Sequence, residues 1–195
     1  MRYILASKSP RRREILSNIG IDFEVITADT DESSDLSDPI ELAEELALRK
    51  GQAVFKKLNE KGEVSPEDII ISADTVVAYG QDILGKPKDR ADARRMLNLL
   101  SGNTHRVISG VALIKDGKSF VSHSETLVSF DTIRDEDIER YISTKDPFDK
   151  AGAYGIQGLA SLWVNRIDGC YFGVVGLPVN ILDRLHRDCT GHSMI

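Results

Sequence analysis

A short segment near the N-terminus gathers positive charge in a chain whose overall charge is negative. The segment SKSPRRR places two serines, a proline and three arginines within residues 7–13, whereas the whole chain of 195 residues has a formal net charge of -6. Guanidinium groups and hydroxyls are donors that bind phosphate oxygens well. The segment therefore predicts a local site for a phosphate-bearing ligand, with Ser7, Ser9, Arg11 and Arg12 as candidate donors.

The elements around this segment explain why an anion would bind there. RYILA predicts a strand, and Ser9 followed by Pro10 is typical of the start of a helix, which Gly20 would end. The free N–H groups of a helix N-terminus favour anions, whereas cations there oppose the helix dipole. A bound anion would resolve this conflict. Because successive helical residues point about 100° apart, the three arginines cannot all face one ligand, and we expect Arg13 to be solvated.

A carboxylate interrupts the most apolar segment of the chain, IIISADTVVAY. An ionised Asp74 in such a strand is costly unless it is paired, hydrogen-bonded or bound to a cation. It could cap a turn, or it could lie at a strand end where open α/β sheets bind their ligands, with the hydroxyl of Thr75 beside it. No histidine stands in a motif with a serine or cysteine, so the candidate bases are Asp74, Glu32 and Asp149.

Three lysines stand where they could contact the same ligand. Lys50 closes the helical segment ELALRKG, although a cation is also ordinary at a helix C-terminus. Lys86 lies in LGKPKD, and Lys150 lies in DKAGAYGIQG, whose glycines permit close approach to a ligand. The chain contains neither GxGxxG nor GxxxxGK[ST], which excludes a Rossmann or a P-loop interpretation.

Strand and helix patterns alternate along the whole chain, which predicts an α/β fold around a central mixed sheet. Alternating residues on both sides of Asp116 and Gly117 predict a hairpin, which we expect to project as a lobe and to leave a cleft beside the main sheet. No repeat or linker divides the chain, so residues 1–195 are expected to form one domain. Helices are predicted over residues 38–58, 88–102, 134–144 and 178–189.

Composition and charge exclude several other classes of protein. The negative net charge argues against broad binding to nucleic acid or anionic membranes. The first apolar run is too short for a signal peptide, and no segment reaches the ~18 apolar residues of a membrane span. Cys170 and Cys189 are too few for a disulfide framework and lack zinc-site spacing. We expect a soluble cytoplasmic protein with no nucleic-acid or membrane partner.

Six segments resemble, in order, the signature blocks of the Maf family of nucleoside-triphosphate pyrophosphatases. They are LASKSPRRREIL, SADTVV, LGKPKD, SGNTHRV, DKAGAYGIQG and VVGLP, and they extend from residue 5 to residue 178. The resemblance implies a fold related to that of the inosine-triphosphate pyrophosphatases, with helices flanking the central mixed sheet and a cleft between two lobes. It also implies a homodimer that hydrolyses a nucleoside triphosphate to the monophosphate and pyrophosphate, using Mg²⁺ or Mn²⁺.

The same resemblance assigns roles to the candidate residues. Asp74 would be the general base, and Glu32 and Asp74 would hold the metal. Base selectivity would depend on Arg11, Thr75 and Gln157, whereas the phosphate and metal site would be lined by Ser7, Arg12, Lys50, Lys86 and Glu32. Tyr154 and Gln157 resemble the branch acting on dTTP and UTP, whereas the branch acting on 7-methyl-GTP has a glutamate in place of Gln157. A glutamine amide has the donor and the acceptor that match the N3–H and carbonyl of thymine or uracil.

Two other functions fit parts of this pattern. A nucleotidyltransferase would use a similar phosphate site but would need a second substrate pocket. A regulatory protein of septum formation would bind the nucleotide as a sensor, without turnover. The sequence favours the pyrophosphatase, and it leaves open the choice among dTTP, UTP and modified pyrimidine nucleotides and the choice between nucleotide-pool cleansing and arrest of cell division.

Overall fold

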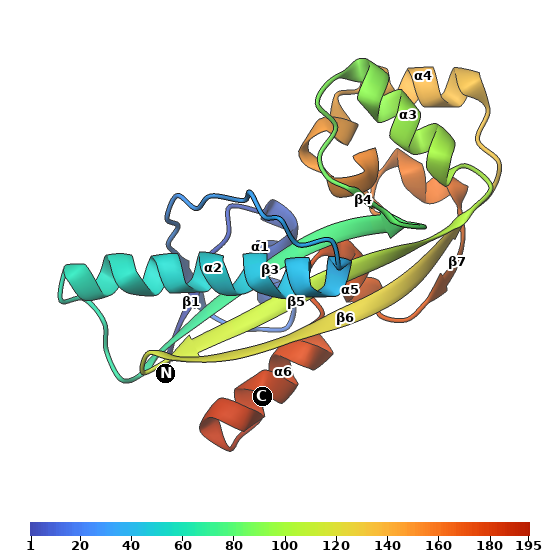
Figure 1. The fold of residues 1–195 in the computed structure, drawn as a ribbon. Coiled ribbons are helices and arrows are strands. Elements are labelled where there is room, and N and C mark those ends of the chain that lie inside the picture. The colour runs from blue at the N-terminus through green and yellow to red at the C-terminus, as the bar shows by residue number, and fades with distance from the viewer.

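A mixed β-sheet runs through both halves of the molecule (Figure 1). The computed structural model describes residues 1–195. Its sheet has the order β2-β1-β3-β5-β6-β7, with β4 paired to β3; β1 runs parallel to β2 and β3, and the other pairs are antiparallel. The strands are β1 (Arg2–Leu5), β2 (Phe23–Val25), β3 (Asp68–Tyr79), β4 (Asp82–Leu84), β5 (Thr104–Lys115), β6 (Lys118–Phe130) and β7 (Val164–Asp168). The predicted α/β fold with a central mixed sheet is confirmed.

Helices cover both faces of this sheet. The long α2 lies along one face and α6 lies on the other, while α3, α4 and three short 3-10 turns form a second lobe at one end (Figure 1). None of the helices is both long enough and apolar enough to cross a membrane. The helices are α1 (Pro10–Asn18), α2 (Pro39–Glu60), α3 (Arg90–Leu100), α4 (Asp135–Ser143), α5 (Tyr171–Val175) and α6 (Val179–Thr190), and the 3-10 turns are η1 (Asp146–Asp149), η2 (Ala151–Ala153) and η3 (Leu159–Trp163).

The predicted hairpin is present, but its predicted position was wrong. β5 and β6 meet at a turn in which Asp116 and Gly117 have φ angles of 49° and 72°. The hairpin does not project as a lobe, because β5 pairs with β3 all the way from Ile70 to Ala78 and therefore lies in the middle of the sheet. The second lobe is built instead by α3, α4 and the 3-10 turns (Figure 1).

Strand β3 changes partner along one edge, and this change opens the sheet beside Asp74. β1 pairs with β3 as far as Ile71, and β4 begins to pair at Val77. Residues 72–76 therefore have no strand partner on this edge, although β5 continues along the opposite edge. Because successive side chains of a strand point to opposite faces, Asp74 and Thr75 reach opposite faces of the sheet at this gap.

Helix α2 lies close to the sheet because two glycines face the contact. A Cβ atom on Gly110 of β5 would lie 2.2 Å from the carbonyl oxygen of Ala43 in α2, and one on Gly51 would lie 2.7 Å from Ser72 Oγ. Both distances are far below a normal van der Waals contact. The absence of these two Cβ atoms therefore sets the distance of α2 from the sheet, and with it the position of Lys50, the neighbour of Gly51 in the helix.

Replacing Gly110 by alanine is expected to lower the free energy of unfolding by roughly 2–3 kcal/mol. The atoms that the new methyl group would meet are backbone atoms of α2, so the helix itself would have to move. Urea denaturation followed by far-UV circular dichroism measures the change. Gly85→Ala is the control, because a Cβ atom there meets nothing within 4 Å. A Gly110→Ala variant as stable as the wild type would show that α2 can shift without loss.

Candidate active site

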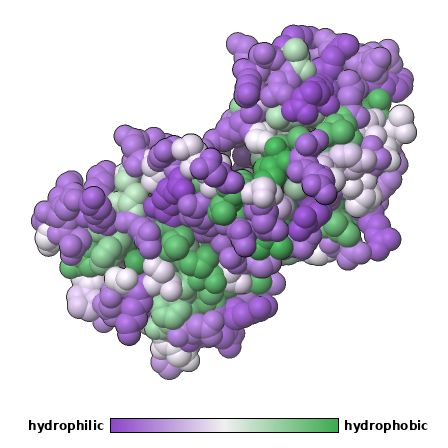
Figure 2. Space-filling view, viewed as in Figure 1, coloured by the Kyte–Doolittle hydropathy of each residue, from purple (hydrophilic) through white to green (hydrophobic).

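A cleft of about 760 Å³ lies at the gap in the sheet, and residues of both lobes line it. The space-filling view shows the surface hollowed between the two lobes (Figure 2). The site residues predicted from the sequence come from segments that are far apart along the chain. All nine line this one cleft: Ser7, Arg11, Arg12, Glu32, Lys50, Asp74, Thr75, Lys86 and Gln157.

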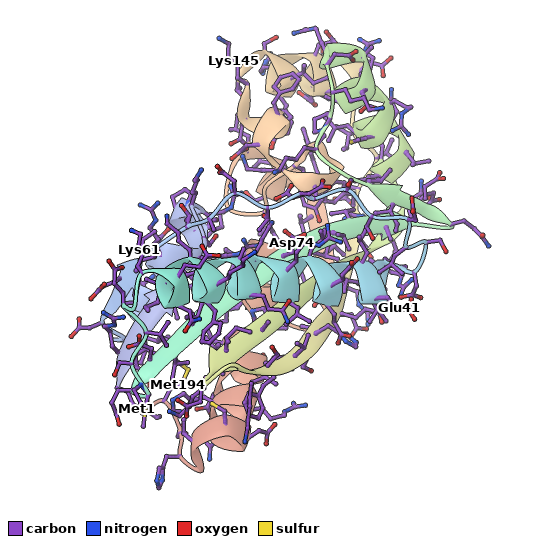
Figure 3. The ribbon with its side chains drawn as sticks, turned by 60° about the vertical axis from the view of Figure 1, so that its left-hand side comes forward. Met1, Glu41, Lys61, Asp74, Lys145 and Met194 are labelled. Atoms are coloured by element: carbon purple, nitrogen blue, oxygen red, sulfur yellow. The ribbon has the colours of Figure 1, made fainter.

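One ammonium group joins two carboxylates on the α2 face of the sheet. Lys50 Nζ contacts Asp74 Oδ1 and lies 2.7 Å from Glu32 Oε1; Asp74 itself lies beside the middle of α2 (Figure 3). The hydrogen bond from Lys50 holds the pKa of Glu32 below its ordinary value, against the effect of burial and with further help from the charges of Lys50 and Lys86. Glu32 is therefore ionised at neutral pH.

The donor chemistry of this pair fits a hard divalent cation. Glu32 and Asp74 both contact one ammonium group, so their oxygens converge on a common region. Carboxylate oxygens are ligands that Mg²⁺ and Mn²⁺ prefer, and phosphate oxygens and waters commonly complete their coordination. No third acidic, histidine or cysteine side chain converges with these two. The pair is thus suited to an open site that shares its metal with a ligand.

On the opposite face of the sheet, Arg12 is partly buried and forms no ion pair with an acidic side chain. Its Nε donates to the carbonyl of Gly176 over 2.8 Å, and its two Nη atoms donate to Ser7 Oγ at 3.2 Å and Thr75 Oγ1 at 3.3 Å. All three acceptors are neutral. Burial lowers the pKa of the guanidinium, while attraction to the charge of Asp74 opposes this effect. A partly desolvated cation whose hydrogen-bond acceptors are all neutral is costly, so an anion bound in the cleft would stabilise this arrangement.

The hydroxyl group of Ser109, which the sequence analysis did not predict, holds the Thr75 side chain in place. Ser109 Oγ donates to the carbonyl of Gly173 over 2.7 Å, which uses its one proton. The 2.7 Å contact between the Thr75 and Ser109 hydroxyls must therefore be donated by Thr75, which in turn accepts from Arg12. Ser109 was missed because only the pairing of β3 with β5 places it opposite Thr75.

The start of α1 agrees with its prediction in all but one respect. Pro10 is the first helical residue and Ser9 occupies the N-cap position, but the Ser9 side chain makes no capping hydrogen bond. Instead, the Ser9 N–H donates to Ser7 Oγ over 3.2 Å. The first turn contains no acidic residue, so its arginines oppose the helix dipole as expected. The result is a concentration of positive potential at the edge of the cleft.

The remaining cations near the cleft have different environments. Arg11 lies 3.9 Å from Asp149 of the second lobe, and Arg13 is exposed, as predicted, and donates to a backbone carbonyl. Lys150 also lines the cleft, but its ammonium contacts carboxylate oxygens of Asp146 and Asp149 at 2.8 Å and 2.6 Å and only 10% of its side chain is exposed. Lys150 therefore braces its own loop.

Two predicted residues reach the cleft from loops. Lys86, 59% exposed, follows β4 and lies 3.7 Å from Glu32 Oε2. Gln157 is exposed at the end of the glycine-rich segment, just before η3. Both side chains line the cleft and have room to turn toward a ligand. The cleft thus combines four carboxylates, which are Asp29, Glu32, Asp74 and Asp149, with several cations and one neutral amide.

Comparisons with known proteins show which family this chain is similar to. A family described as "Maf-like protein" matches residues 2–189. The dTTP/UTP pyrophosphatase of Alkaliphilus oremlandii is 52% identical over 90% of this chain and 90% of its own. Those of Acetivibrio thermocellus and Bacillus cytotoxicus are 46% identical (96% of this chain, 95% of theirs) and 45% identical (94% and 93%). The structure of the Staphylococcus aureus Ham1 protein aligns with a TM-score of 0.47 and 17% identity, over 67% of this chain and 72% of that one.

Removal of the Lys50 ammonium is expected to raise the pKa of Glu32. The hydrogen bond from Lys50 is the largest cause of the lowered pKa, and without it the neighbouring Asp74 would repel the Glu32 carboxylate. Carbon-13 NMR titration of the Glu32 carboxyl group in Lys50→Met should show protonation at a higher pH than in the wild type. The control is Lys56→Met, since Lys56 is exposed and pairs with Glu60 elsewhere on α2. An unchanged Glu32 titration in Lys50→Met would contradict the pairing.

Proposed function

The chain belongs to the Maf-like protein family, and we propose that it hydrolyses dTTP and UTP, together with modified pyrimidine nucleotides, to the nucleoside monophosphate and pyrophosphate. The observation that carries the proposal is the partly buried guanidinium of Arg12, which hydrogen-bonds only to neutral acceptors at the edge of the cleft. The similar proteins of known name, dTTP/UTP pyrophosphatases at 45–52% identity, support the choice of reaction.

The triphosphate would lie along the positive side of the cleft. It brings about four negative charges, which explains why an acidic chain gathers cations at this point. Ser7, between β1 and α1, and Arg12, in the first turn of α1, would donate to phosphate oxygens, and Lys86 would reach them from the loop after β4. These donors would also stabilise the charge that develops on the leaving pyrophosphate.

Asp74 would act as the general base. Its carboxylate would orient and deprotonate a water that attacks the α-phosphorus in line, while the bond to pyrophosphate breaks. Lys50 would hold this carboxylate in position. A divalent cation held by Glu32 and Asp74 would supply neutralising charge at the phosphates.

The base would be recognised at the second lobe by Gln157, with Arg11 and Thr75 nearby. The Gln157 amide offers one donor and one acceptor to the N3–H and carbonyl of a pyrimidine. The hydroxyl proton of Thr75 is already donated to Ser109, so Thr75 could only accept from a ligand. Because Thr75 has no proton left to donate, we expect Gln157 to make the main hydrogen bonds that recognise the base.

The domain organisation, cellular location and oligomeric state are proposed from the same family membership. We propose that residues 1–195 act as one domain, that the protein works in the cytoplasm, and that it forms a homodimer. The exposed Leu159 and Leu162, just before the edge strand β7, offer apolar surface for a second copy. The proposed hydrolysis would either remove modified pyrimidine nucleotides from the nucleotide pool or contribute to the arrest of cell division.

The proposed reaction is tested by a panel of nucleoside triphosphates, with Mg²⁺, with Mn²⁺ and with a chelator. We expect metal-dependent release of pyrophosphate from dTTP and UTP, with the monophosphate as the second product, and much slower release from purine nucleotides. The variant Gln157→Glu should lose this preference, because a carboxylate cannot donate to the pyrimidine carbonyl. An unchanged substrate order in that variant would contradict the role of Gln157. Binding of nucleotides without any turnover would favour the nucleotide sensor instead.

Asp74→Asn is expected to lower kcat by about 10²-fold or more, because the amide keeps the shape of the side chain but cannot accept the proton. Binding of a non-hydrolysable dTTP analogue, measured by calorimetry, should be largely retained. Asp31→Asn is the control, since Asp31 precedes Glu32 but does not line the cleft. Full turnover by Asp74→Asn would exclude this carboxylate as the base.

A further inference from the structure

A tyrosine and a histidine form a buried polar pair behind the cleft. Tyr154 Oη lies 2.7 Å from His105 Nε2, and the two residues are 6% and 1% exposed. The other ring nitrogen, Nδ1, is buried without any hydrogen-bond partner. Burial lowers the pKa of His105 to about 4, so the imidazole is neutral at physiological pH.

A contribution to the stability of the fold does not explain why His105 and Tyr154 are present, because the pair leaves one buried nitrogen without a partner. An unpartnered buried nitrogen costs about 1–3 kcal/mol, and the surroundings of His105 are aromatic, with the ring of Phe130 at 5.0 Å. An apolar side chain would fill the same space without that cost. Polar groups that break the rules of core packing are expected where function requires them, so the role of the pair must be sought in what it connects.

The pair connects the central sheet to the loop that carries Gln157. His105 lies in β5, the strand that also provides Ser109 and so holds Thr75. Tyr154 lies just before Gln157 in the chain and itself lines the cleft. The hydrogen bond between them therefore links the loop that carries Gln157 to β5, the strand that also positions Thr75 through Ser109.

The backbone before Tyr154 is strained, which makes such an anchor necessary. Ala153 has a φ of 61°, in the left-handed region, and is completely buried. This conformation costs about 1–2 kcal/mol for a residue with a Cβ atom and persists only where the surroundings enforce it. On one side, the N–H of Gly152 donates to the carbonyl of Gly85 over 3.1 Å. On the other side, the side chain that holds the chain in place is Tyr154.

A third anchor lies at the far end of the loop and does not involve the sheet. Tyr141 Oη accepts from the N–H of Gly155 at 3.3 Å and donates to Asp146 at 2.7 Å. This contact ties the loop to α4 within the second lobe. Only the His105–Tyr154 hydrogen bond ties its side chains to β5.

We infer that His105 and Tyr154 are positioning residues that set the direction of the Gln157 amide and thereby the selectivity for pyrimidine bases. The inference rests on the proposed function. Loss of the hydrogen bond would let the strained turn relax and shift Gln157. The proposed phosphate contacts of Ser7 and Arg12 come from the other side of the cleft, where neither residue contacts this loop. The change should therefore appear in recognition of the base, with little effect on the chemical step.

The test compares Tyr154→Phe with the wild type by measuring kcat and KM for dTTP and for GTP with Mg²⁺. We expect the ratio of the two kcat/KM values, dTTP over GTP, to fall about tenfold, mainly through a higher KM for dTTP. Partial unfolding cannot produce this result, because it would lower the amount of active enzyme equally for both substrates and would cancel in the ratio. His105→Phe should lower the ratio by the same factor, and the double variant should lower it no further.

The chain offers a matched control in a second tyrosine–histidine pair. Tyr3 Oη lies 2.9 Å from Nε2 of the buried His186, and neither residue lines the cleft. Tyr3→Phe should leave the selectivity ratio unchanged. A Tyr154→Phe enzyme that turns over dTTP with the wild-type ratio would overturn the inference and leave the proposed function intact. A wild-type enzyme that releases no pyrophosphate from dTTP would overturn the proposed function and the inference with it.

Discussion

The close contact of α2 with the sheet governs the geometry of the cleft. At Gly110 and Gly51 the backbone of the helix approaches the strands to a distance that no Cβ atom would permit. This contact also sets the position of Lys50, because Lys50 is the neighbour of Gly51. The Lys50 ammonium then contacts both Asp74 and Glu32. An ion pair of this kind depends steeply on distance in a partly buried site. A helix displaced by the width of a methyl group would separate the charges and leave Asp74 without its partner.

The gap in the edge of β3 has an electrostatic consequence. Side chains alternate along the strand, so Asp74 and Thr75 project to opposite faces, yet both remain accessible from the one cleft. The face that carries Asp74 and Glu32 offers carboxylate ligands to a cation beside the ammonium groups of Lys50 and Lys86, and the face that carries Arg12 offers donors to an anion. A nucleoside triphosphate bound with a divalent cation presents both charges together. At the unpaired edge of β3, one ligand can therefore contact the carboxylates on one face and Arg12 on the other.

Sequence reasoning identified the cleft residues well because their types are unusual for their positions. Three arginines at a helix N-terminus and an aspartate in an apolar strand each conflict with local preferences, and such conflicts are visible without a structure. Residues with ordinary types were missed or misjudged for the same reason. Ser109 depends on strand pairing, and Lys150 was expected to face a ligand although two aspartates of its own loop hold it. The hairpin was recognised from its alternation, but alternation contains no information on which strand it joins.

Unfavourable local features cluster around the cleft. Arg12 is partly buried with only neutral hydrogen-bond acceptors, Ala153 has a left-handed backbone conformation, and His105 retains an unpartnered nitrogen. Each lowers stability by an amount that a simple apolar or glycine substitution would recover. The first is relieved when an anion binds, whereas the other two persist whether or not the cleft is filled. Both lie at the loop that bears Gln157, where the hydrogen bonds of Tyr154 to His105 and of Gly152 to Gly85 hold the strained turn in one conformation. If this loop reads the base as proposed, its selectivity would depend on rigidity that is already present in the folded chain and that the ligand does not need to supply.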